Sequence, residues 1–342
     1  MPAPASHSPL PDFLRRYPRI LGEGAVIERL RRRSGIALDP HLVNAAFVYE
    51  PTTRALLADI YRQYLEIGRE FDLPLFLTAP TWRANAVNIA AAGCGGREVN
   101  ADNVRLLQDL RAATGSYAAK VVIGGMIGCR GDAYRPDEAL DAREARVFHA
   151  WQADRLAVAG ADFLIAITQP ALSEALGLAG AMAATGRPYL VSFVVRPTGI
   201  LLDGTPLGEA LAAIDGAVRP QPTGYLINCT HPDFARAALW HPTHASPQAR
   251  KRVIGLLANT AALSPELLDG QEKLIEAEPA AFAANMASLA HDSGLRILGG
   301  CCGTDDRHIR CLAAELRRAQ AFDPIAEYPP SLCARRLRPP GP

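Results

Sequence analysis

The sequence lacks an excess of either charge. Its 36 Lys and Arg residues nearly balance 35 Asp and Glu residues, so the formal net charge at pH 7 is +1. Without a broad basic or acidic field, the chain has no global attraction to nucleic acid or to a cationic partner. We therefore expect a small-molecule substrate and no nucleic-acid partner, and we interpret the basic run Arg29–Arg33 as a solvated helix face.

Long apolar runs are also missing. No stretch reaches the roughly 18 apolar residues that span a bilayer. The segment Met1–Pro11 has neither the basic start nor the apolar centre of a secretory signal. The seven cysteines are odd in number and follow no disulfide-framework spacing, which favours a reducing compartment. We expect a cytoplasmic protein that does not bind membranes and in which some thiols serve chemistry.

No G-x-G-x-x-G motif follows the first expected strand, which weighs against a doubly wound dinucleotide-binding sheet. Short apolar runs instead alternate with longer segments of helical periodicity. The expected strands are Arg19–Leu21, Leu75–Thr78, Lys120–Ile123, Phe163–Ile167, Tyr189–Val194, Gly224–Asn228, Val253–Ala258 and Leu295–Leu298. The expected helical segments include Thr53–Phe71, Val99–Thr114, Asp141–Ala159, Ala171–Thr185 and Pro279–Ser293.

This alternation predicts an α/β fold, a single-domain (β/α)₈ TIM barrel over residues 19–320. An N-terminal extension, residues 1–18, precedes the barrel, and a Pro- and Arg-rich tail, residues 321–342, follows it. The segment between the first two strands, about residues 22–74, is longer than one helix requires. We expect it to carry an extra loop over the mouth of the barrel.

Two adjacent cysteines, Cys301 and Cys302, stand among three glycines directly after the eighth expected strand. This pattern alone fits either a pair of metal ligands or a tight turn with two buried thiols. A third cysteine, Cys229, follows the sixth strand, and the carboxyl ends of barrel strands meet at one mouth. Three thiolates that converge there predict a catalytic Zn²⁺ site with three protein ligands and one open position, and the alternative is three unrelated buried cysteines.

These segments resemble the paired signatures of the homocysteine S-methyltransferase family, over about residues 20–318. The matching motifs are Gly22-Glu23-Gly24, Gly160-Ala161-Asp162, Ser192-Phe193, Asn228-Cys229-Thr230, Gly299–Thr304 and His308-Ile309. The resemblance implies a (β/α)₈ barrel with zinc held by Cys229, Cys301 and Cys302. It also implies transfer of a methyl group from a sulfonium or ammonium donor to the thiol of homocysteine, which yields methionine.

The family pattern further suggests substrate contacts. Glu23 replaces a family Asp that contacts the amino-acid part of the substrate, and its alternative role is to cap a loop. Trp82, after the second strand, either faces a cationic donor or packs on the barrel rim. Weaker aromatic candidates are Tyr49, Tyr134 and Trp240. Asn228 and Asn259 match family positions near the substrate, or they only hold backbone, as Asn often does in turns.

Ile167 is the sharpest departure from the family pattern, because a carboxylate usually stands there and holds the substrate amino group. An aliphatic side chain cannot pair with an ammonium. Either Glu23 and backbone carbonyls bind that group alone, or the acceptor is not ordinary homocysteine. A methyltransferase for another thiol or selenol, and a non-catalytic zinc- or thiol-binding relative, are the alternatives. The donor is not indicated, and a monomer or a small homo-oligomer are both compatible with the sequence.

The remaining cysteines and histidines that attract notice are interpreted as structural. Cys94 lies in a loop of small residues, and Cys129 follows the third strand as a rim residue. His231, His241 and His244 cluster after the sixth strand, but three better-placed thiols leave them as loop residues.

Overall fold

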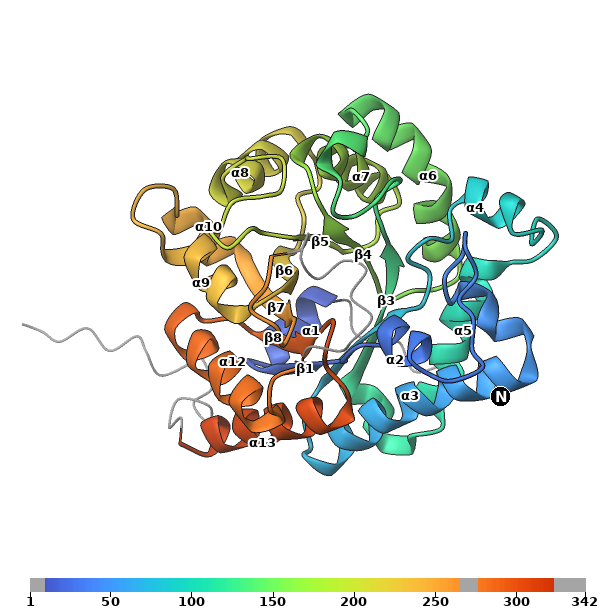
Figure 1. Ribbon diagram of the computed structural model, residues 1–342, viewed down its shortest axis with the longest axis horizontal. Coiled ribbons are helices and arrows are strands. Elements are labelled where there is room, and N and C mark those ends of the chain that lie inside the picture. Colours follow the sequence, from blue (N-terminus) through green and yellow to red (C-terminus); the bar gives the residue numbers. More distant parts are fainter. Residues whose placement is uncertain (1–9, 265–275, 323–342) are drawn as a thin grey trace, which may run out of the picture.

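The computed structural model, which describes residues 10–264 and 276–322, shows a closed barrel of parallel strands in the order β1 to β8 (Figure 1). The strands are β1 (Ile20–Gly22), β2 (Leu75–Ala79), β3 (Val121–Ile127), β4 (Phe163–Gln169), β5 (Tyr189–Phe193), β6 (Gly224–Thr230), β7 (Val253–Ala258) and β8 (Ile297–Gly300). Every expected strand is present, and the predicted (β/α)₈ barrel is confirmed.

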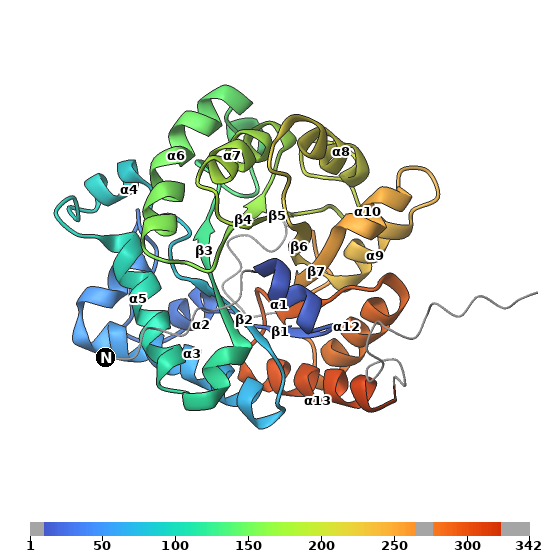
Figure 2. The ribbon, with the colours of Figure 1, turned by 180° about the vertical axis from the view of Figure 1, so that it is seen from behind.

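Helices form a ring outside the strands, except for α1 (Leu10–Arg16), which lies across one end of the barrel (Figure 1 and Figure 2). They are α1 (Leu10–Arg16), α2 (Ile27–Arg31), α3 (Pro51–Glu70), α4 (Ala86–Ala91), α5 (Val99–Ala112), α6 (Ala142–Val158), α7 (Leu172–Ala184), α8 (Leu207–Ala217), α9 (Pro232–Trp240), α10 (Pro247–Arg252), α12 (Pro279–Ser293) and α13 (Asp306–Phe322). Short 3₁₀ turns are η1 (Ala45–Tyr49), η2 (Gly115–Lys120) and η3 (Pro136–Glu138). The expected helical segments correspond to α3, α5, α6, α7 and α12.

Large side chains from the strands fill the inside of the barrel. Phe76 and Phe163, for example, have ring centroids 4.8 Å apart. Helix α1 adds Leu10, Phe13 and Leu14 to the same core, beside side chains from the first residues of several strands. It therefore covers the amino-terminal end of the barrel, opposite the mouth (Figure 2).

Helix α1 lies within the predicted N-terminal extension, for which the sequence analysis named no helix. Its core residues have the i, i+3, i+4 spacing of one helical face, but the helix is only seven residues long. Most of the predicted tail lies outside the described residues, so the division into extension, barrel and tail stays a prediction. No helix in the described part of the chain is long and apolar enough to cross a membrane.

The long connection between β1 and β2 contains α2, η1 and α3. Its residues 24–28, together with Asn44, line a cavity at the barrel mouth. The expected loop over the mouth is therefore present. The interpretation of Arg29–Arg33 as a solvated face is wrong for Arg29, whose side chain is only 16% exposed and pairs with Asp306 at 3.0 Å.

Candidate metal centre and active site

The structure brings the predicted cysteine ligands together at the barrel mouth. Cys229 lies near the end of β6, and Cys301 and Cys302 directly follow β8. Their three Sγ atoms all lie within 4.8 Å of one another, and the Sγ atoms of Cys229 and Cys302 are 3.6 Å apart. The cysteines are free thiols. Because two sulfurs bound tetrahedrally to one zinc ion at about 2.3 Å stand roughly 3.8 Å apart, the spacing suits zinc.

A left-handed backbone at Cys229 marks the end of β6. Its φ is 52°, and the register between β6 and β7 shifts between Asn228 and Thr230. L-residues rarely adopt this conformation, and it persists only where the surrounding structure enforces it. A matching irregularity occurs on β4, where Thr168 has φ 58°.

Asn228 connects these two irregular strand ends. Its Oδ1 accepts hydrogen bonds from the Thr168 amide at 2.9 Å and the Ser192 hydroxyl at 2.7 Å. Its Nδ2 donates to the Thr168 hydroxyl at 2.8 Å. Asn228 is fully buried and thus links β4, β5 and β6 directly beneath Cys229. These contacts agree with the alternative that Asn228 positions the backbone. A contact between Asn228 and the substrate stays a prediction.

The glycines before Cys301 allow β8 to approach β1 closely. A Cβ on Gly299 would stand 2.8 Å from the carbonyl oxygen of Glu23, and one on Gly300 would stand 2.3 Å from the Thr304 hydroxyl. The Gly300 amide donates to that same Glu23 carbonyl at 2.8 Å. The glycine-rich motif therefore positions both cysteines against the first βα loop.

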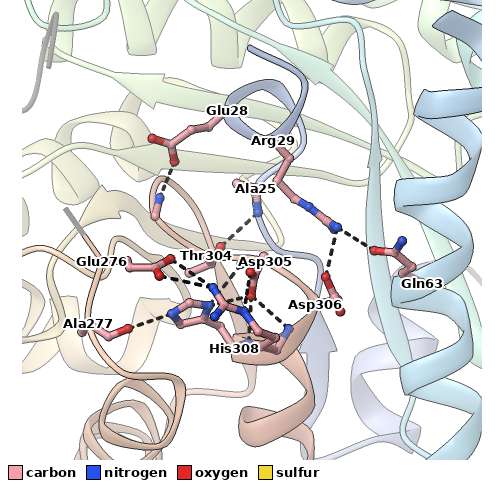
Figure 3. Close-up of polar contacts among 12 residues, drawn as sticks. Ala25, Glu28, Arg29, Gln63, Glu276, Ala277, Thr304, Asp305, Asp306 and His308 are labelled. Carbon is pink, nitrogen blue, oxygen red and sulfur yellow. Dashed lines mark hydrogen bonds and ion pairs between the residues drawn. The ribbon is translucent and has the colours of Figure 1, made fainter. Parts of the chain in front are cut away.

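Polar contacts connect the β1–α2 loop with the turn after β8 (Figure 3). The Thr304 hydroxyl accepts from the Ala25 amide at 3.0 Å and donates to the Cys301 carbonyl at 2.6 Å. The Glu28 carboxylate accepts from the Gly303 amide. Arg29 joins Gln63 at 2.6 Å to Asp306 at 3.0 Å, which fixes α3 against α13.

A buried histidine completes this group of contacts at the start of α13 (Figure 3). The His308 ring lies 2.8 Å from the Asp305 carboxylate through Nδ1 and 2.9 Å from the Ala277 carbonyl through Nε2. Its side chain is fully buried. His308, which belongs to the matching family motif, therefore has a structural role in the turn after the cysteines.

The three thiols share their protons unequally. Hydrogen bonds from the Cys301 and Cys302 thiols hold the pKa of Cys229 well below its ordinary value. The same interactions with Cys229 raise the pKa of Cys301 and of Cys302. The Asn259 side chain also hydrogen-bonds to Cys229 and favours its thiolate. Cys229 is therefore the first of the three to ionise.

A cavity of about 670 Å³ lies above the cysteines. Every residue that the sequence assigned to substrate binding lines it: Glu23, Trp82, Asn228 and Asn259. The Glu23 carboxylate accepts from the Thr78 amide at 3.1 Å and contacts the Thr78 hydroxyl at 2.5 Å. Burial outweighs these hydrogen bonds and raises the pKa of Glu23 to about 8.

Ile167 lines the same cavity at the end of β4 and is 8% exposed. Ile167 thus belongs to the buried core of the barrel and also lines the cavity. Apolar Leu257 and Ala261 also face this space. The cavity wall near β4 is aliphatic where the family pattern has a carboxylate.

Tyr134 lies closer to the cysteines than the sequence indicated. Its hydroxyl oxygen is 2.9 Å from Cys229 Sγ. The loop that carries it is held by Glu174 of α7, whose carboxylate accepts from the amides of Arg130 at 2.6 Å and Leu140 at 3.1 Å. His149 of α6 lies 2.9 Å from this carboxylate. A residue ranked as a weaker aromatic candidate thus lies beside the predicted metal ligands.

The other weaker aromatic candidates lie elsewhere. Tyr49 bonds Asp102 at 2.9 Å, and Trp240 is 47% exposed on α9, where Arg250 covers its ring. Neither lines the cavity within the described part of the chain.

The cysteines and histidines interpreted as structural also stay outside the cavity, as far as residues 10–264 and 276–322 show. They are Cys94, Cys129, His231, His241 and His244. Burial raises the pKa of Cys129 to about 12, which makes that thiol inert at neutral pH.

A sequence model described as homocysteine S-methyltransferase matches residues 20–316. The chain belongs to the homocysteine S-methyltransferase family. The resemblance drawn from the cysteine motifs is thereby confirmed, and the protein is a member of a family of methyltransferases.

Relatives across the family match most of the chain. The homocysteine S-methyltransferase of Escherichia coli strain K12 is 27% identical over 328 residues, which cover 91% of this chain and 99% of the relative. Betaine–homocysteine S-methyltransferase 1 of Mus musculus is 22% identical over 325 residues, which cover 90% of this chain and 74% of the relative.

The barrel also resembles a solved structure of the family. The metallated form of the homocysteine methyltransferase MmuM from Escherichia coli has a TM-score of 0.70 at 25% identity, and the match covers 90% of this chain and 99% of that one. In this homocysteine S-methyltransferase family member, a group of three cysteines suited to a metal ion thus occupies the mouth of the shared fold.

Proposed function

We propose that the protein is a zinc-dependent S-methyltransferase that transfers a methyl group from a sulfonium or ammonium donor to the thiol of homocysteine. The observation that carries this proposal is the convergence of three free cysteine sulfurs, within 4.8 Å of one another, beside a cavity of about 670 Å³. This volume is in the range of small-molecule sites and has room for an acceptor beside a donor.

Cys229, Cys301 and Cys302 would hold the zinc ion. Zinc accepts thiolate ligands, and three protein ligands leave a fourth position for a substrate. The lowered pKa of Cys229 and the thiol spacing both suit this role. A free thiol has a pKa near about 8.5 and is mostly protonated at pH 7. A bound zinc ion would deprotonate the acceptor thiol at neutral pH, because a thiol that coordinates zinc binds as the thiolate.

The reaction is a displacement at the methyl carbon. The acceptor loses its thiol proton to solvent, and its sulfur forms a bond to the methyl carbon. The bond from that carbon to the donor sulfur or nitrogen breaks. The donor keeps the electron pair and leaves as a neutral thioether or tertiary amine. The residues of the cavity contribute by aligning the two reactants and excluding water.

Trp82 and Tyr134 offer aromatic surface to the positively charged donor. Both line the cavity, and the Tyr134 hydroxyl lies 2.9 Å from Cys229 Sγ. An onium group is attracted to the electron-rich face of an aromatic ring.

Glu23 is a cavity residue suited to the ammonium group of homocysteine. Its raised pKa keeps it mostly protonated at pH 7 in the empty cavity. A bound ammonium favours the carboxylate, because an opposite charge nearby lowers the pKa of a carboxyl group. Acceptor binding and ionisation of Glu23 are thus linked.

Ile167 favours a second candidate acceptor, a thiol without the amino group. It places an aliphatic wall in the cavity where the family has a carboxylate. Titration calorimetry with L-homocysteine and with 4-mercaptobutyrate tests this candidate on the zinc-loaded protein. Tighter binding of the des-amino thiol would support it. Equal or tighter binding of homocysteine would exclude it.

Metal analysis and a methylation assay test the main proposal. We expect one zinc per chain, its loss in the double variant Cys229→Ser with Cys301→Ser, and formation of methionine from homocysteine. Retention of zinc by the double variant would refute the site. Zinc without methyl transfer to any thiol or selenol from several donors would indicate a non-catalytic binding protein. We further propose that the enzyme is cytoplasmic and acts as a monomer or small homo-oligomer without nucleic-acid partners.

A further inference from the structure

The loop between β3 and α6, residues 128–141, brings a hydroxyl group to one of the predicted metal ligands. The Tyr134 hydroxyl oxygen lies 2.9 Å from Cys229 Sγ. The Tyr134 side chain also packs against the small apolar cluster of Val194, Leu202 and Cys229. An element that supplies none of the three cysteines is therefore in direct contact with the proposed metal centre.

A single buried carboxylate joins the two ends of this loop. Glu174 of α7 is fully buried, and it accepts from the Arg130 amide at 2.6 Å through one oxygen and from the Leu140 amide at 3.1 Å through the other. His149 of α6 lies 2.9 Å from the first of these oxygens. Burial of a carboxylate is costly unless its hydrogen bonds are made. These bonds therefore hold both ends of the loop in fixed positions.

Further polar contacts fix the middle of the loop. The Asp132 carboxylate accepts from the Tyr134 amide at 2.8 Å, and the Asp132 amide donates to the Glu138 carboxylate at 3.0 Å. The Gly131 carbonyl accepts from the Arg83 guanidinium at 2.7 Å. A Cβ on Gly131 would stand 2.7 Å from a Glu138 carboxylate oxygen, so the loop is also closely packed. The backbone of Tyr134 is therefore positioned independently of the contact with sulfur.

The phenol is the donor in this contact when Cys229 binds a metal. A coordinated cysteine is a thiolate, which has no proton to donate. A phenol in water has a pKa of about 10 and keeps its proton at pH 7. Three thiolates around a divalent zinc ion leave the centre with a net negative charge, and a hydrogen bond to a charged acceptor is stronger than one between neutral groups. The geometry therefore suits a hydrogen bond that stabilises the metal-bound thiolate.

We propose that Tyr134 is a positioning residue of the metal centre, where its hydroxyl donates a hydrogen bond to the Cys229 thiolate and Glu174 maintains this bond by fixing the loop. The inference rests on the zinc site of the proposed function. Partners of this kind orient the ligands of a metal and tune the charge that they donate. Withdrawal of charge from Cys229 favours coordination of a further sulfur, which is the acceptor thiol in the proposed reaction.

The Tyr134→Phe variant tests the hydrogen bond, because it removes the hydroxyl and keeps the ring. The probes are Zn²⁺, whose affinity is measured by competition with a chelator, and Co²⁺ in its place, followed by the sulfur-to-metal charge-transfer absorption. We expect the zinc dissociation constant to rise about tenfold. The charge-transfer band should move to longer wavelength, because a thiolate without this hydrogen bond gives up electron density more easily. Asn259 also contacts Cys229, so metal binding should be weakened and not lost.

Tyr61→Phe is the matched control. Tyr61 also lines the cavity, and its buried hydroxyl donates to the Thr78 carbonyl at 2.9 Å and not to a cysteine. The control therefore loses a tyrosine hydroxyl and one hydrogen bond, as Tyr134→Phe does. It should leave the charge-transfer band and the zinc dissociation constant unchanged, even if the loss lowers the free energy of unfolding.

The Glu174→Gln variant tests the support of the loop. It replaces one carboxylate oxygen by an amide nitrogen, so one of the two loop amides loses its acceptor. We expect the band and the zinc affinity to change in the same direction as in Tyr134→Phe. The double variant should behave as Tyr134→Phe alone, because both substitutions act through one hydrogen bond. If Glu174→Gln does not fold, Asp132→Ala is used in the same comparison, since the exposed Asp132 carboxylate holds the Tyr134 amide.

An unchanged band and zinc affinity in Tyr134→Phe, or an equal change in Tyr61→Phe, would overturn the role of Tyr134. Additive effects in the double variant would overturn the role of Glu174. Failure of the unaltered protein to bind either metal would refute the zinc site and this proposal together. Metal binding without methyl transfer would refute the proposed activity alone, because these measurements do not depend on turnover.

Discussion

Replacement of Glu23 by Gln should change the number of protons released when homocysteine binds. Glu23 is buried, contacts Thr78 through both carboxylate oxygens and has its pKa raised to about 8. At pH 7, one pH unit below this pKa, about 90% of the side chain is protonated. An ammonium partner lowers the pKa, so binding releases about 0.9 proton from Glu23.

The acceptor thiol contributes a second proton. With an unperturbed pKa of about 8.5 it is about 97% protonated at pH 7, and it binds zinc as a thiolate. Homocysteine should therefore release about two protons from the zinc-loaded protein. Homocysteine should release only about one proton when it binds the Glu23→Gln variant. Binding of 4-mercaptobutyrate to the unaltered protein should also release about one proton.

Calorimetry in buffers of different ionisation enthalpy measures these proton numbers directly. The zinc-loaded state is required, because the cysteine ligands then stay ionised throughout the titration. Equal proton release by the unaltered protein and Glu23→Gln would refute the assignment of Glu23 to the ammonium group. A release that remains near two protons at pH 9 would also refute it. At that pH the Glu23 carboxylate is already mostly ionised and the acceptor thiol is partly ionised.

The same pKa also predicts a change in stability. A carboxyl group that is harder to ionise in the folded protein destabilises the fold as pH rises from about 4.5 to about 8. The rise in pKa corresponds to at most about 5 kcal/mol, at about 1.4 kcal/mol per pKa unit. Glu23→Gln should therefore raise the free energy of unfolding at pH 9 by a few kcal/mol and leave it nearly unchanged at pH 5.

Three further substitutions probe the cavity and the fold. Ile167→Glu introduces a carboxylate into the cavity and should tighten homocysteine binding about tenfold relative to 4-mercaptobutyrate, which is the effect of one charged hydrogen bond. Calorimetry measures the ratio of the two affinities. An unchanged ratio would show that the amino group binds elsewhere. Asn228→Leu leaves the buried Thr168 amide unpaired and should lower the free energy of unfolding, measured in urea, by about 2–4 kcal/mol. A loss smaller than about 1 kcal/mol would contradict the role of Asn228 in linking β4, β5 and β6. Phe13→Ala should cost about 3 kcal/mol by the same measurement with kcat and KM unchanged, since α1 lies at the opposite end of the barrel.

The sequence predicted the elements whose signals are local. The alternation of apolar runs and helical segments indicated the barrel, and the placement of Cys229 and Cys301 after different strands indicated that their sulfurs meet. That meeting needed no contact information, because the carboxyl ends of parallel barrel strands share one face.

The sequence did not indicate the residues whose positions depend on tertiary contacts. Tyr134 reaches Cys229 because Glu174, on a helix 40 residues further along the chain, holds its loop. Arg29 looked solvated within a basic run, yet it is held by partners on α3 and α13.

The packed interior of the barrel affects the order in which substrates bind and products leave. Side chains such as Phe76 and Phe163 fill the space beneath the cysteines, and α1 closes the far end. In the described part of the chain the cavity is therefore a blind recess with the three cysteines at its floor, where we propose that the acceptor sulfur binds. A donor that occupies the recess first obstructs the thiol, so we expect homocysteine to enter before the donor, and methionine to leave only after the demethylated donor has gone.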